Sequence, residues 1–179
     1  ELVREVDQKL DAWMTRLLLR FKAEKSRTLY FNGSGRGSDA WDLARGTQDL
    51  HYLGARITFQ GGVGLKKEKA ADLQQVLRQR LRQSGKLLEN LPLEERGAIL
   101  CAVAAETLDP GSRLSHPASA LLGHVINDRA QLKHLDYLIA LEVARVLSGV
   151  VGPRAFRAVA YRRLRRWGLP SLVHRRDRS

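Results

Sequence analysis

The chain has very little cysteine, and this scarcity sets its first limits. Its single cysteine, Cys101, excludes a disulfide within the chain and a zinc site built from several thiolates. The longest apolar stretch, residues 137–152, contains Glu142 and Arg145 and is too short to span a bilayer. No signal-like segment is visible, and the chain begins at Glu1, which indicates a processed form or part of a longer protein. We therefore expect a reducing compartment such as the cytoplasm, and no membrane partner.

Aromatic residues are also scarce, whereas basic residues are abundant. Aromatics make up 6% of the chain, which argues against the stacking platforms that single-strand RNA readers use. Lys and Arg number 31 against 19 Asp and Glu, a formal net charge of +12. A soluble chain this basic repels itself unless it binds anions. The composition predicts a nucleic-acid partner, DNA more than RNA.

Hydrophobic periodicity predicts a mainly α, compact multi-helix domain with two short β-strands in the first third. The strands are expected near 27–31 and 55–60. The first helical stripe, which includes Val6, Leu10 and Trp13, is expected to face the core. Apolar residues at steps of three and four predict helices over 1–25, 64–91, 91–108, 117–125 and 128–147.

The chain is expected to divide into a helical core domain, residues 1–151, and a basic C-terminal helix and tail, residues 152–179. Pro153 suits the first turn of a helix and Gly168 its end. A helix between them would carry apolar side chains on one face and arginines on the other. The last residues are expected to form a frayed basic tail.

The positive charge is concentrated in two segments. Residues 152–179 hold nine Arg against one Asp, and residues 64–86 hold seven basic against two acidic residues. Arginine suits phosphate because its planar guanidinium donates to two oxygens at once. A face of arginines alone exceeds what solubility requires. The candidate nucleic-acid-binding residues of these segments are Arg154, Arg157, Arg162, Arg163, Arg165, Arg166, Lys66, Lys67, Arg78 and Arg82.

Residues 30–41, YFNGSGRGSDAW, raise the question of a phosphate-binding loop. Gly33, Gly35 and Gly37 give G-x-G-x-G, whereas a dinucleotide fold needs G-x-G-x-x-G and a P-loop needs Gly-Lys-Ser/Thr. We therefore expect no cofactor here. The loop is expected instead to order on nucleic acid, with Arg36 as a phosphate contact.

The second predicted strand offers a way to read base sequence. Arg56, Thr58 and Gln60 alternate with Ile57 and Phe59. In β-ribbon DNA readers, one strand face enters the major groove and the other packs on helices. The pattern weakly resembles a ribbon-helix-helix arrangement, and a half-buried edge strand gives the same alternation. Arg56 and Thr58 are the candidate base readers.

Catalytic and metal-binding motifs are missing from the sequence. No two of the five histidines lie three or four residues apart, as ligands on one helix face would, and no G-x-S-x-G elbow occurs. Acids and a histidine crowd together at Asp42, Asp49 and His51, where a metal-dependent nuclease would place its ligands. A short polar segment also produces that pattern by chance, so we expect no enzyme, no metal and no cofactor.

The sequence thus predicts a protein that binds nucleic acid, chiefly DNA, by neutralising backbone phosphates through Arg-rich helices. The alternative is a structural helical subunit of a larger nucleoprotein assembly. Such a subunit would bind mainly protein partners or a second copy of itself. A steep fall of affinity with salt separates the first prediction from the second.

Overall fold

The computed structural model describes residues 2–17, 49–58 and 61–176, and its contacts divide the chain into two units, residues 1–48 and 49–179. Helices dominate the described residues, which confirms the mainly α class. The strand expected near 55–60 is present as β2 (Ala55–Thr58). The strand expected near 27–31 lies outside the described residues.

The first unit contributes the helix α1 (Leu2–Arg16). Its apolar stripe was expected to face a core, but Val6, Leu10 and Trp13 are 48%, 47% and 67% exposed. On the helix surface, Lys9 Nζ donates to a carboxylate oxygen of Glu5 at 2.8 Å. Periodicity therefore identified an amphipathic helix correctly, but it does not show what covers the apolar face.

A three-stranded antiparallel sheet opens the second unit, with β2 between β1 (Asp49–Tyr52) and β3 (Val63–Leu65). The sequence predicted neither β1 nor β3, and the three residues of β3 are too few to show a period-two pattern. The free edge of β3 is covered by residues at and just before the start of a later helix, α5 (Arg129–Ser148). Gln131 Oε1 accepts from Leu65 N at 2.6 Å, and Gln131 Nε2 donates to Leu65 O at 2.9 Å. Val63 on the same edge donates to Asn127 Oδ1 at 2.6 Å, and its carbonyl accepts from the backbone of Asn127 and Asp128.

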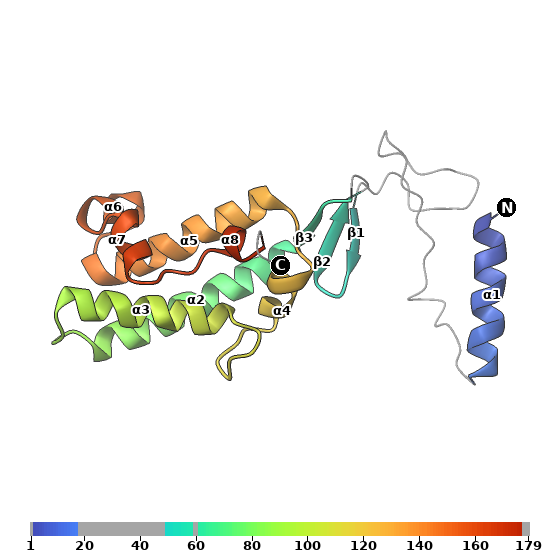
Figure 1. Ribbon diagram of the computed structural model, residues 1–179, viewed down its shortest axis with the longest axis horizontal. Coiled ribbons are helices and arrows are strands. Elements are labelled where there is room, and N and C mark those ends of the chain that lie inside the picture. The colour runs from blue at the N-terminus through green and yellow to red at the C-terminus, as the bar shows by residue number, and fades with distance from the viewer. Residues whose placement is uncertain (1, 18–48, 59–60, 177–179) are drawn as a thin grey trace. The chain divides into compact units, whose positions relative to one another are not determined.

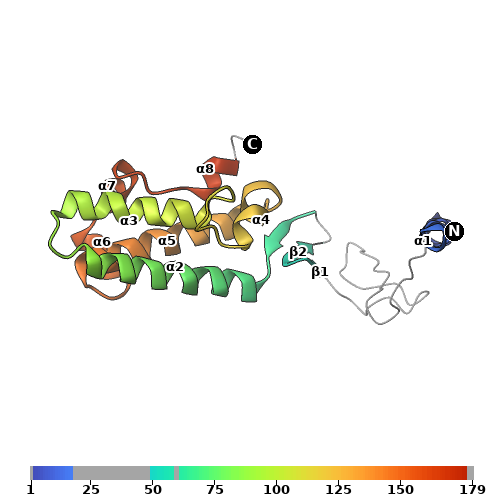
Figure 2. The same cartoon turned by 90° about the horizontal axis from the view of Figure 1, so that it is seen from below.

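Three long helices form the core of the second unit (Figures 1 and 2). They are α2 (Lys67–Leu87), α3 (Leu93–Leu108) and α5 (Arg129–Ser148), and each contacts the other two. The short α4 (Ala118–His124) contacts β3. All four were predicted to within four residues at each end, because leucines at helical spacing supply their buried faces.

The C-terminal segment is broken into short pieces and is not the single helix expected between Pro153 and Gly168. A 3₁₀ turn, η2 (Gly152–Arg154), leads into α6 (Ala155–Ala158), and α7 (Tyr161–Arg166) follows two extended residues. Ala155 and Leu164 are both fully buried. A continuous helix turns by about 100° per residue and would place them on opposite faces. The break lets both side chains reach the core.

The last described residues are packed against the bundle and are not frayed as expected. Leu169, Leu172 and Val173 are buried, and α8 (Leu172–Arg176) contacts α5 and α4. Asp136 of α5 accepts hydrogen bonds from Ser171 Oγ at 2.8 Å and from Leu172 N at 2.7 Å. This carboxylate caps α8 from a distant helix, so no local sequence pattern announces it.

Candidate nucleic-acid interface

One end of the helical bundle gathers basic side chains. The last turns of α2 and α5 and the start of α3 lie at the end opposite the sheet, together with α6 and α7 (Figure 1). We call this region the basic end. Its basic residues are Arg82, Lys86, Arg96, Arg145, Arg154, Arg157, Arg162, Arg163, Arg165 and Arg166.

Four arginines of the basic end are available to a partner. Arg154, Arg157, Arg162 and Arg166 are exposed, and none of them forms an ion pair with another described residue. They come from η2, α6 and α7, all of which α5 supports. We call these four residues the arginine cluster. Its uncompensated charge creates a positive potential that attracts anions.

Two other predicted phosphate ligands, Arg163 and Arg165, are engaged within the protein. Arg163 forms an ion pair with Glu94 at the start of α3, and its guanidinium lies 5.3 Å from the ring centre of Trp167. The hydrogen bond from Arg163, with a second from Trp167 Nε1, holds the pKa of Glu94 below its ordinary value. Arg165 Nη1 donates to the carbonyl of Leu169 at 2.7 Å. The contacts with Glu94 dock α7 onto α3, and the Arg165 bond joins α7 to the residues that follow it.

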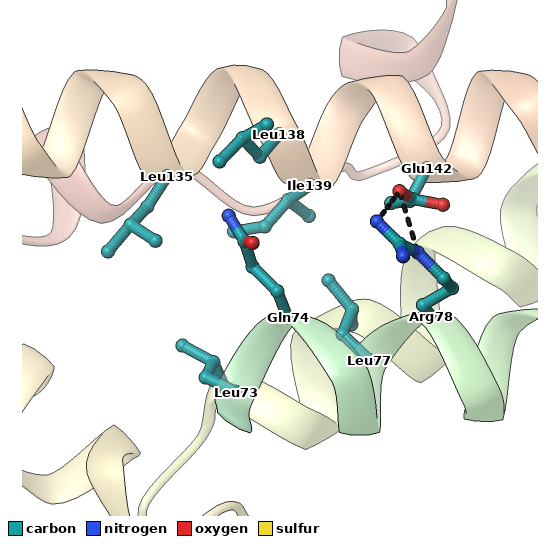
Figure 3. A pocket seen from close by; sticks show the side chains of 8 residues that line it. All are labelled: Leu73, Gln74, Leu77, Arg78, Leu135, Leu138, Ile139 and Glu142. Carbon is teal, nitrogen blue, oxygen red and sulfur yellow. Dashed lines mark hydrogen bonds and ion pairs between the residues drawn. The ribbon is translucent and has the colours of Figure 1, made fainter. Parts of the chain in front are cut away.

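Most of the predicted ligands on α2 lie away from the basic end. Lys66 and Lys67 stand at the start of the helix, roughly 28 Å from its last turn at 1.5 Å per residue. Arg78, near the middle, donates to Glu142 Oε1 from Nε at 3.0 Å and from Nη2 at 2.8 Å (Figure 3). Of the predicted α2 ligands, Arg82 alone lies at the basic end.

The predicted base readers lie in the sheet, at the other end of the unit. Arg56 Nη2 donates to Asp128 Oδ2 at 3.3 Å, and Thr58 Oγ1 accepts from Gly62 N at 3.1 Å. β2 is the central strand, so neighbouring strands occupy both of its edges. Arg36 and the glycine loop 33–38 lie outside the described residues.

The described residues contain no group of three or more His, Cys, Asp or Glu that could hold a metal ion. Of the acids that crowd with His51 in the sequence, Asp42 lies outside the described residues, and the side chains of Asp49 and His51 are not described. Cys101 is fully buried, and burial raises the pKa of its thiol to about 11. Such a thiol is a poor nucleophile.

Among the described helices, none combines the length and apolar character needed to cross a membrane.

A groove of about 430 Å³ opens at the basic end, and the sequence did not predict it. Arg96 and Arg145 contribute to it, although each stands outside the two basic segments of the chain. Only the packing of three helices brings them to the same place. The residues that line the groove are Arg82, Gly85, Lys86, Glu89, Arg96, Glu142, Arg145, Val146, Gly149, Val150 and Val151.

A second hollow lies between α2 and α5, where Leu77, Ile139 and the Arg78–Glu142 pair line its wall (Figure 3). Its volume of about 20 Å³ is room for about one water molecule. This hollow is therefore too small for a ligand. The groove at the basic end is the larger of the two and the more polar.

Comparison with known proteins assigns the chain to no group. It matches no family model, no curated protein and no solved structure.

Proposed function

We propose that this protein binds nucleic acid, DNA in the first place, through the phosphate backbone at its basic end. The arginine cluster is the observation that carries this proposal. Its four side chains are exposed and carry one sign of charge. Each guanidinium suits bidentate donation to phosphate oxygens. Binding neutralises phosphates and releases counterions, in a reducing compartment that contains nucleic acid, such as the cytoplasm.

Binding through this surface is expected to depend little on base sequence. Phosphate contacts fix the position of a protein on a duplex but carry no base identity. The side chains of Arg56 and Thr58 bond within the protein. Reading of bases by these two residues, and phosphate contact by Arg36, stay predictions of the sequence.

The test is fluorescence anisotropy of random duplex DNA and of single-stranded RNA over a salt series. We expect a steep fall of affinity with salt for the wild-type chain. In the triple variant Arg157→Gln, Arg162→Gln and Arg166→Gln, the slope should flatten by about one unit per lost phosphate contact.

A matched control removes three charges from the sheet end of the bundle. Lys69, Arg113 and Lys133 are exposed and lie outside the basic end. Their replacement by Gln changes the net charge equally but should leave the salt slope close to that of the wild type. Equal losses in both triple variants would mean that net charge, and not the arginine cluster, attracts DNA.

The exposed face of α1 favours a second candidate, a structural helical subunit of a nucleoprotein assembly. Val6, Leu10, Trp13 and Leu17 are 47–67% exposed, and an apolar face of this kind commonly packs on a protein partner. Sedimentation of the chain tests self-association as one form of this role. Association that Leu10→Glu abolishes, together with DNA binding of shallow salt dependence, would favour this candidate over the first.

A further inference from the structure

The groove at the basic end has the charge of an anion site. Four basic side chains and two acidic ones line it, which leaves two positive charges in excess. The acid Glu142 is only 8% exposed and already accepts from Arg78 at 2.8 Å and from Arg145 at 2.9 Å. Its charge is thus compensated inside the protein. The groove therefore presents Arg82, Lys86 and Arg96 to whatever enters, with Glu89 as its one remaining acid.

Arg145 is paired with Glu142, but other donors of the groove have no partner among the described residues. Arg96 Nε is buried and has no hydrogen-bond partner in the part of the chain that the structure describes. Buried donors are almost always paired, and an unpaired one calls for an explanation such as a bound ion. Arg82 and Lys86 lie one helical turn apart, and neither forms an ion pair with a described residue. Like charges at this spacing repel unless an anion joins them.

The walls of the groove fix its shape and give it an apolar side. A Cβ built on Gly85 would lie 2.3 Å from Val146 Cγ1, so the glycine lets α2 and α5 come close together there. Gly149 ends α5 in the left-handed conformation at φ 69°. Val150 and Val151, which follow it, are 37% and 75% exposed at the rim. An organic group can rest on these side chains.

Size and charge together select the ligand. The volume of about 430 Å³ falls within the range of small-molecule sites. A phosphate monoester carries a charge of about −1.5 to −2 at neutral pH. It matches the two excess positive charges, whereas an internal phosphodiester of nucleic acid carries a single charge. We propose that the groove binds a phosphate monoester, with the phosphate among Arg82, Lys86 and Arg96 and the organic part against Val150 and Val151.

Two sources supply this chemistry. One is a free mononucleotide, and the other is the terminal phosphate of a nucleic-acid strand. The second source rests on the proposed function. The proposal for the groove itself holds for either source. It uses side chains that are separate from the arginine cluster.

Isothermal titration of the full chain with AMP and with adenosine tests the proposal. AMP is expected to bind at least ten times more tightly than adenosine. The double variant Arg82→Gln and Lys86→Gln changes two exposed positions of α2 and should weaken AMP binding at least tenfold. Arg96→Gln, checked for folding by circular dichroism, should act in the same direction, and Arg113→Gln at the other end should change nothing.

Failure of AMP to bind, equal affinity for AMP and adenosine, or AMP binding that the double variant leaves unchanged would each overturn the proposal. These results would leave the salt-dependent binding of duplex DNA by the arginine cluster intact. Conversely, the arginine cluster variant should bind AMP as the wild type does. The two proposals therefore fail separately.

A pair of single-stranded oligonucleotides, one with a 5′-phosphate and one with a 5′-hydroxyl, distinguishes the sources. Tighter binding of the phosphorylated strand, lost in the double variant, assigns the groove to nucleic-acid ends. Equal binding of the two strands, with AMP binding retained, assigns it to free phosphate esters.

Discussion

At the residue scale, the position of α7 on the bundle depends on one glycine. Gly97 of α3 lies under Trp167, and a Cβ built on it would lie 2.3 Å from Cε3 of the indole ring. The same indole donates to Glu94 and supports Arg163 by its ring face. The absence of a side chain at position 97 therefore lets Trp167 pack closely on α3. This packing positions α7 and, with it, Arg162 and Arg166 of the arginine cluster.

Gly97→Ala is expected to destabilise the protein. Overpacking costs about 1–3 kcal/mol, whereas Ala in place of Gly in a helix returns up to about 1 kcal/mol. We expect a net loss of about 1–2 kcal/mol in the free energy of unfolding, measured by urea denaturation. Gly123→Ala in α4 is the control, because its Cβ would lie an ordinary 3.5 Å from Pro110 Cγ. Equal stability of the two variants would show that Trp167 does not rest on Gly97.

At the element scale, sequence periodicity predicted the long helices and missed what depends on distant contacts. Leu73, Leu77 and Leu81 repeat every four residues, and all three are buried. The break before α7 follows instead from the need to bury both Ala155 and Leu164. No propensity marks that break, since neither Pro nor Gly occurs at residues 159–160.

The docking of α8 is an element-scale feature that one substitution tests. Asp136→Ala removes the acceptor that Ser171 Oγ and Leu172 N share, and leaves buried donors without a partner. Loss of a helix cap costs about 0.5–2 kcal/mol. We expect that loss in urea denaturation, with faster hydrogen exchange at residues 171–176. Ser171→Ala removes one donor to Asp136 and the acceptor of His174 N at 3.3 Å, but it keeps the buried bond from Leu172 N to Asp136 and should lose less. Unchanged exchange in Asp136→Ala would contradict this role of the carboxylate.

At the scale of the whole molecule, the sequence predicted that charge would be segregated but not how it is distributed in space. The segment 152–179 does supply the arginine cluster, and none of those four side chains forms an ion pair with an acid among the described residues. The basic run of α2 instead extends over its whole length, so Lys67 and Lys86 lie at opposite ends of the bundle. Arg96 and Arg145 enter the groove only because α3 and α5 converge on α2.

This distribution predicts that DNA protects one end of the second unit. Hydrogen exchange with and without duplex DNA at low salt should slow at residues 152–168 and leave the strands at 49–58 and 63–65 unchanged. A bound polyanion stabilises the elements it contacts, and 0.5 M salt should remove the protection because counterion release no longer favours binding. Protection spread evenly over both ends would mean that DNA coats a generally basic surface. Protection confined to the sheet would mean that DNA binds at β2, where Arg56 was predicted to read bases, and not at the basic end.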